Sequence, residues 1–285
     1  MFRTDPAPRP ASLPVPVVDT HTHIDLVDAG FPADSAVIPS VDDPAVAKWL
    51  DEAASAGVEH VVQVGTDVAS STWAADLADS DRRVLAAVAL HPNDAPLLGD
   101  IHGALNEIDH LAARERVAAL GETGLDYFRT GPEGRSVQRL SFRAHIEMAK
   151  RRDKTLVIHD REAHDDCLAI LDDEGAPDRV VFHCFSGDYV FAEECAKRGF
   201  FMSFAGNVTF KNAGELRKAL TFVPSDHLLV ETDAPFMAPV PVRGYRNEPA
   251  LTAYTVSYIA EFLGKDLSKL CFQLDQNTRR AFGNW

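Results

Sequence analysis

Six side chains of the types that bind divalent cations follow short apolar runs in this sequence. His21 and His23 are separated by one residue, and because side chains alternate across a strand, both would point the same way and could chelate one ion. The others stand alone after later runs and are Glu122, His159, His183 and Asp233. Histidine and carboxylate donors in this combination indicate a metal centre.

Each of these residues also has an ordinary structural explanation. An H-x-H spacing is common in loops, and a single histidine after an apolar run is more often a hydrogen-bonded core residue than a ligand. Glu122 or Asp233 could cap a turn or the next helix. Glycines lie on both sides of Glu122, at 121 and 124, and would let other groups approach as closely as a carboxylate shared by two ions requires. We interpret the six as one set because such residues recur at five strand ends.

Eight candidate strands alternate with helical patterns along the chain. The strands are expected at 15–20, 59–65, 84–90, 117–121, 155–158, 179–182, 200–204 and 228–231. Helices are expected at 43–56, 136–152, 189–197 and 213–220, with a helical segment at 249–282. Gly57 and Gly199 are placed to end the helices that precede them.

This alternation predicts an α/β fold with parallel strands and right-handed crossovers, which close most naturally into a single-domain (β/α)8 TIM barrel. A doubly wound open sheet is the alternative. We expect the barrel to cover residues 15–285, after a flexible proline-rich leader at 1–14. In a barrel the carboxyl ends of all strands meet at one face, so the candidate ligands would converge there.

The composition limits the classes of function. A formal charge of −15 disfavours a surface that wraps duplex DNA, although bound cations could still attract one phosphate. Four cysteines without paired spacing are typical of a reduced compartment, and no apolar run is long enough for a membrane span. We therefore expect a cytoplasmic protein with no membrane association and no obligate protein partner.

Several motifs resemble the TatD family of metal-dependent deoxyribonucleases, a branch of the amidohydrolase-like barrels. They are DTHTHID at 19–25, ALHP at 89–92, LGETGLDY at 120–127, VIHDREA at 157–163, FHCFSG at 182–187, ETDAP at 231–235 and RNEP at 246–249. The resemblance runs from about residue 17 to residue 282. The chain departs from the family pattern in having Thr20 and Thr22 around His21 and in its leader.

The resemblance implies two divalent metal ions per chain, with Glu122 shared between them. One ion would be held by Glu122 together with His21, His23 and Asp233, and the other by Glu122 together with His159 and His183. The ions would activate water, with Asp233 as proton acceptor and Glu122 as the second catalytic carboxylate. Mixed nitrogen and oxygen ligands suit Zn, Mn, Fe or Co at least as well as Mg.

Further residues are candidates for binding the substrate. His91 follows the third strand and is expected to bind a substrate phosphate, although a structural His-Pro turn would explain it too. The guanidinium groups of Arg161, Arg243 and Arg246 could bind phosphate, although loop arginines are usually only solvated. Asp126 and Glu248 are expected to support the site rather than to react.

The resemblance implies hydrolysis of DNA phosphodiesters, with single-stranded ends as the expected partner. No aromatic platform of the OB or RRM type is visible in the pattern. The same metal centre could attack carbonyl groups, so a small-molecule amide or ester hydrolase, or an aminoacyl-ester deacylase, is the alternative activity. A non-catalytic metal-binding protein is the third possibility, and the presence of Asp233 beside the ligands argues against it.

Overall fold

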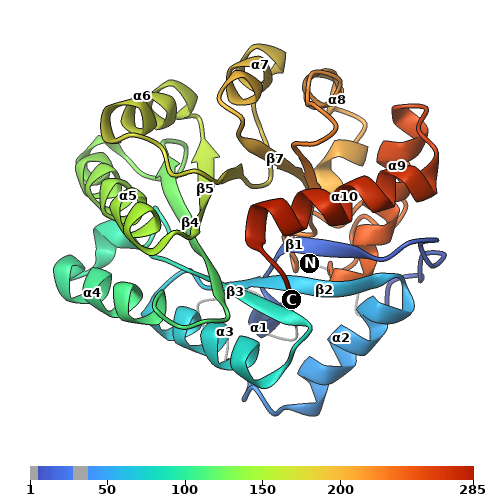
Figure 1. Cartoon of the computed structure of the whole chain (residues 1–285), viewed down its shortest axis with the longest axis horizontal. Helices are drawn as coiled ribbons and strands as arrows, with labels where there is room; N and C mark the ends of the chain where they lie inside the picture. The colour runs from blue at the N-terminus through green and yellow to red at the C-terminus, as the bar shows by residue number, and fades with distance from the viewer. Residues whose placement is uncertain (1–5, 28–37) are drawn as a thin grey trace.

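Eight parallel strands form one sheet in the order of the sequence, as the alternating pattern predicts. The computed structural model describes residues 6–27 and 38–285. The strands are β1 (Val17–Thr22), β2 (Val58–Val64), β3 (Val84–Val88), β4 (Val117–Asp126), β5 (Thr155–Arg161), β6 (Val180–Phe182), β7 (Phe201–Phe204) and β8 (Leu228–Val230). This is the (β/α)8 barrel expected from the sequence, and Figure 1 shows its strands surrounded by helices.

The helices lie outside the strands and connect them. They are α1 (Ile24–Val27), α2 (Pro44–Ser55), α3 (Val68–Ser80), α4 (Ile101–Leu111), α5 (Pro132–Arg152), α6 (His164–Glu174), α7 (Tyr189–Lys197), α8 (Gly214–Leu220), α9 (Thr252–Phe262) and α10 (Leu267–Phe282), with short 3-10 turns η2 (Ala95–Leu97), η3 (Gly206–Thr209) and η4 (Pro249–Leu251). The four helices expected between the strands are present, and Gly57 and Gly199 follow helices α2 and α7 with positive φ angles of 83° and 71°.

The first and last strands are joined by side chains as well as by backbone. Asp19 accepts hydrogen bonds from the Thr232 backbone N (2.8 Å) and the Thr232 hydroxyl, and Thr20 Oγ1 donates to the Val230 carbonyl (2.9 Å). The Asp233 backbone N donates to the His21 carbonyl at 2.9 Å. These contacts bring the end of β1 against the segment after β8, so the two ends of the sheet meet.

Alternate residues of the strands fill the inside of the barrel. One buried cluster includes Val62, Leu85, Ala119, Val157, Val181, Phe201 and Leu229, which come from seven strands. The same cluster contains Ala281 and Phe282 from the end of α10, and the Thr155 hydroxyl donates to the Ala281 carbonyl. Because Thr155 begins β5, α10 covers the amino-terminal end of the barrel and leaves the carboxyl-terminal end for a site.

The sequence-based strand limits were wrong at three places that matter for the site. Predicted ends at residues 20, 121 and 158 came from the end of each apolar run, but β1, β4 and β5 continue to Thr22, Asp126 and Arg161. The β4–β5 pairing runs on, with Gly124 opposite His159 and Asp126 opposite Arg161. Backbone pairing does not stop where side chains become polar, so His21, Glu122 and His159 lie within strands.

The described part of the leader lies along the barrel. The Leu13 backbone N donates to the Ala56 carbonyl (3.0 Å), and the Tyr254 hydroxyl donates to the Pro8 carbonyl (3.2 Å). Arg9 forms ion pairs with Glu52 and Glu248. Glu248, which was expected to support the site, is thus in contact with the leader. Residues 1–5 lie outside the described residues, and the flexibility of the leader stays a prediction. Within the described residues, no helix has the length and hydropathy of a membrane span.

Candidate metal centre

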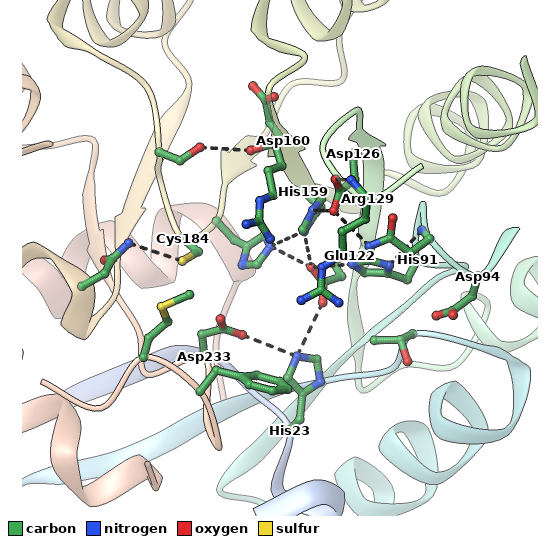
Figure 2. A pocket seen from close by; sticks show the side chains of 18 of the residues that line it. His23, His91, Asp94, Glu122, Asp126, Arg129, His159, Asp160, Cys184 and Asp233 are labelled. Carbon is green, nitrogen blue, oxygen red and sulfur yellow. Dashed lines mark hydrogen bonds and ion pairs between the residues drawn. The ribbon is translucent and has the colours of Figure 1, made fainter. Parts of the chain in front are cut away.

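The six candidate ligands meet at the carboxyl-terminal ends of the strands, around a cavity of about 500 Å³. Five of them line the cavity, and His21 lies beneath it with no exposed surface. Figure 2 shows His23, Glu122, His159 and Asp233 pointing toward one another. The residues come from strands that are far apart in the sequence, so the convergence expected for a barrel is present.

Glu122 is the centre of the cluster because its two carboxylate oxygens face different histidines. Oε1 lies 3.6 Å from His21 Nε2 and 3.5 Å from His23 Nε2. Oε2 lies 2.7 Å from His183 Nε2 and 3.1 Å from His159 Nδ1. Each carboxylate oxygen thus faces its own pair of imidazoles, which is the arrangement that a shared ligand needs. The two pairs adjoin, because the rings of His21 and His183 stack with their centres 3.9 Å apart.

The glycines around Glu122 allow this close packing, as the sequence indicates. A Cβ at Gly121 would overlap the Val157 side chain of the neighbouring strand. Gly124 has a φ of +134°, and a Cβ there would overlap the His159 carbonyl. A larger residue at either position would push β4 away from β5 and separate Glu122 from His159.

Three of the imidazoles are oriented by an acceptor on their outer nitrogen. His23 Nδ1 lies 2.9 Å from the Val64 carbonyl, His159 Nε2 lies 3.2 Å from Asp126 Oδ2, and His183 Nδ1 lies 3.3 Å from Glu231 Oε1. A nitrogen that donates its proton outward leaves the lone pair of the other nitrogen pointing inward, which is how histidine ligands are usually prepared. In this cluster the inward nitrogens face Glu122.

The histidines of the cluster differ in the direction of their pKa shifts. Burial lowers the pKa of His21 to about 4, with a contribution from His183, and burial lowers the pKa of His91 to about 3. Burial alone would raise the pKa of Glu122, but His183, His91 and His159 together hold it well below its usual value. Against the effect of burial, Glu122 raises the pKa of His23 to about 9 and raises that of His183, and Asp126 and Glu122 raise that of His159. Metal ions bind neutral imidazoles, so a bound cation would take the place of the protons on these three histidines. Four imidazoles and two carboxylates in one cluster are a donor set that fits a divalent cation.

Asp233 lies across the cavity from Glu122, three residues beyond β8. The residue is 9% exposed, and its Oδ1 is 3.8 Å from His23 Nε2. Burial raises the pKa of Asp233 to about 7. Its φ of 54° and the hydrogen bond from its backbone N to the His21 carbonyl fix the direction of the side chain. Asp233 is thus placed at the edge of the cluster that is open to the cavity.

Potential ligand atoms gather in three overlapping groups, each within 4.8 Å. The groups are His21, His23 and Glu122; His21, His183 and Asp233; and His91, Glu122 and His159. The third group includes His91, whose Nε2 lies 3.7 Å from Glu122 Oε2. His91 therefore lies closer to the ligands than the sequence indicates, and its role in binding a substrate phosphate stays a prediction.

The arginines predicted to bind substrate differ in position. Arg161 lines the cavity, but neither Arg243 nor Arg246 is among the described residues that line it. The Arg243 guanidinium stacks on Phe210 at 3.9 Å, and Arg246 donates to the Val27 carbonyl. Both follow β8 in sequence, but their loop directs them to neighbouring protein groups.

Sequence reasoning missed several residues that shape the cavity. Arg129 lines it, and Figure 2 shows its side chain extending toward Glu122. Glu231 accepts from the Cys184 backbone N (2.8 Å) besides contacting His183, and Asn93 donates to Asp126 Oδ2 (2.9 Å). Glu231 could have been found by its place just before Thr232-Asp233, whereas Arg129 carries no signal that separates it from a solvated loop arginine.

Comparisons with known proteins find relatives over nearly the whole chain. A family model described as "TatD related DNase" matches residues 18–283. An uncharacterized metal-dependent hydrolase TatD of Mycobacterium tuberculosis is 43% identical over 271 residues, covering 94% of this chain and 98% of that protein. The uncharacterized metal-dependent hydrolase YcfH of Escherichia coli is 37% identical over 267 residues, covering 93% and 95%. The solved structure of YJJV, a TatD homolog from Escherichia coli, has a TM-score of 0.81 at 27% identity, covering 93% of this chain and 97% of that chain.

Proposed function

Because the chain belongs to the family of TatD-related DNases, we propose that this metal-dependent hydrolase cleaves phosphodiester bonds in DNA and acts on single-stranded ends. The observation that supports a phosphate substrate most directly is that Arg129 and Arg161 line the same cavity as the histidine and carboxylate cluster. Guanidinium groups bind phosphate oxygens well, and two of them next to a cation site favour an anionic substrate over a neutral ester.

In this proposal the six predicted ligands would hold two ions, and Glu122 would serve both. Divalent ions at such a site supply an activated water and neutralise phosphate oxygens. The chain itself orients the imidazoles through Val64, Asp126 and Glu231, and Asp233 accepts a proton at the open edge of the cluster. No nucleophilic side chain is required, because water attacks the phosphorus.

The proposed activity is tested by offering three substrates to the same metal-loaded protein. A single-stranded oligonucleotide, a phosphomonoester and an acyl ester are compared side by side, with chelated protein as the control. We expect the oligonucleotide to be cleaved with the highest kcat/KM. Faster turnover of the acyl ester, with the oligonucleotide intact, would contradict the proposal and favour an amide or ester hydrolase.

DNA binding should depend only weakly on salt. With a formal charge of −15 the surface cannot supply many phosphate contacts, so recognition is confined to the cavity. Two arginine contacts to a single strand correspond to a slope of log affinity against log salt of about −1.4. We expect single strands to be bound and cut in preference to matched duplex. The measurement is binding by Asp233→Asn protein over a salt series.

Arg161 and Arg243 form a matched pair for this measurement. Each guanidinium stacks on a phenylalanine, at 4.0 Å from Phe128 and 3.9 Å from Phe210, but of the two only Arg161 lines the cavity. Arg161→Ala should therefore weaken binding and make the salt slope shallower by about 0.7, whereas Arg243→Ala should change neither. A steep slope in the parent protein, or preference for duplex, would mean that a basic surface outside the cavity binds DNA.

A further inference from the structure

Phe128 is a large aromatic residue that the structure leaves 58% exposed, in the loop between β4 and α5. Single exposed apolar residues are common and need no explanation by themselves. Phe128 is distinguished by its surroundings, because it precedes Arg129 and carries the Arg161 guanidinium 4.0 Å from its ring centre. Both arginines line the cavity of the metal centre. Phe128 does not itself line the cavity but lies beside these two arginines, at an outer border that we call the rim.

The ring is tied to the cluster by one carboxylate. Asp126 Oδ1 accepts hydrogen bonds from the backbone N of Phe128 (3.1 Å) and of Arg129 (2.8 Å). The other oxygen of Asp126 lies 3.2 Å from His159 Nε2. Asp126 is fully buried, so the backbone of Phe128 is held at a fixed position relative to His159.

Strand pairing fixes the position of Arg161, whose guanidinium stacks on the Phe128 ring. Asp126 pairs with Arg161 across β4 and β5, and the Tyr127 backbone N donates to the Arg161 carbonyl at 2.9 Å. The aromatic ring and the guanidinium therefore start from neighbouring strand ends rather than from independent loops. Such a stack is a preorganised planar surface next to an arginine that lines the cavity.

The chemistry of this rim fits a ligand that combines a phosphate with a flat ring. An anionic group would be held at the arginines and the cation site, while an aromatic face beside them offers stacking, which any nucleobase can use. A purely anionic ligand would leave the exposed ring without a contact, and an aliphatic ester would make no use of two arginines.

We propose that Phe128, supported by Arg161, is a stacking platform for the nucleobase next to the phosphate held in the cavity. This inference rests on the proposed function and adds the group by which the strand end is recognised. A base in an intact duplex is already stacked and paired and must be unstacked before it can reach the ring. The platform therefore gives a physical reason for a preference for unpaired ends.

The test uses the full-length metal-loaded protein and a fluorescent nucleotide. The 5′-monophosphate of 2-aminopurine deoxyriboside is titrated with parent protein, Phe128→Ala, Phe128→Trp and Phe272→Ala. Phe272 is the matched control, because it is 59% exposed and belongs to α10, the helix that covers the opposite end of the barrel. Base stacking of ordinary strength predicts that Phe128→Ala raises Kd at least about fivefold and reduces the quenching of fluorescence. Phe128→Trp should retain both, and Phe272→Ala should match the parent.

Deoxyribose 5-phosphate, which lacks a base, separates stacking from phosphate binding. As a competitor of the nucleotide, it should bind parent and Phe128→Ala protein with the same dissociation constant. An oligonucleotide with an abasic end should be cut by both proteins at the same kcat/KM. The platform is overturned if Phe128→Ala binds the fluorescent nucleotide like the parent, or weakens the baseless ligand as much as the nucleotide. Nucleotide binding that depends on Phe128 in a protein that cuts no DNA would support the platform and reject the proposed function.

Discussion

Replacing Asp233 by asparagine is expected to reduce turnover by about three orders of magnitude while the barrel stays folded. Asparagine keeps the shape of the side chain but cannot accept a proton, and positioned proton transfer typically contributes between 10² and 10⁴ in rate. The backbone hydrogen bond from residue 233 to the His21 carbonyl does not involve the side chain and should remain. Turnover of the oligonucleotide and the circular dichroism spectrum of the variant are the measurements.

The control for this change is Asp94→Asn, the same substitution on another carboxylate that lines the cavity. Asp94 belongs to none of the three groups of ligand atoms among the described residues, so its effect on turnover should be less than about tenfold. Metal content must be measured in both variants, because asparagine is a weaker ligand than aspartate. A well-folded Asp233→Asn protein with near-parent activity would exclude Asp233 as the proton acceptor.

The fold could be predicted from the sequence because its signals are local and repeated. Eight apolar runs, five of them followed by a helical pattern that could be named, permit few topologies, and all eight strands form near their predicted positions. Helices α3, α4 and α6 were not singled out. Helix α3 is the clearest example, since Ser70, Ser71, Trp73, Ala74 and Leu77 are all buried and leave little amphipathic contrast.

The candidate ligands could also be predicted, because ligand residues must follow strands in a barrel and because the family motifs mark them. Their surroundings could not. Asp126 holds the backbone of Arg129 beside the cavity, whereas the Arg243 guanidinium stacks on Phe210 and does not line the cavity. The direction of each side chain depends on such contacts in the folded chain, so the sequence alone does not distinguish one loop arginine from another.

Glu122 is the second position where a single change should have a large effect. Its carboxylate oxygens face His21 and His23 on one side and His159 and His183 on the other, so replacing one oxygen by an amide nitrogen removes an acceptor from one side and the charge from both. Glu122→Gln should therefore lose most of its bound metal and at least about 10³ of its activity, since both ions of the proposed centre would lose their shared anionic ligand.

Elemental analysis after metal loading and desalting measures this prediction, with His91→Ala as the comparison. The parent should hold more than one transition ion per chain, because six ligands exceed the needs of one tetrahedral site. His91 lies 3.7 Å from Glu122 Oε2 but on the outer side of the cluster, where it is partly exposed, so its loss should cost less metal than the loss of the central carboxylate. Equal losses in the two variants would make His91 a ligand instead of a substrate group, and the group formed by His91, Glu122 and His159 would then be the one that holds the second ion. A parent protein that never exceeds one ion per chain would rule out the binuclear centre. One oxygen of Glu122 would then bind a single cation together with one pair of imidazoles, and the other oxygen would accept hydrogen bonds from the second pair.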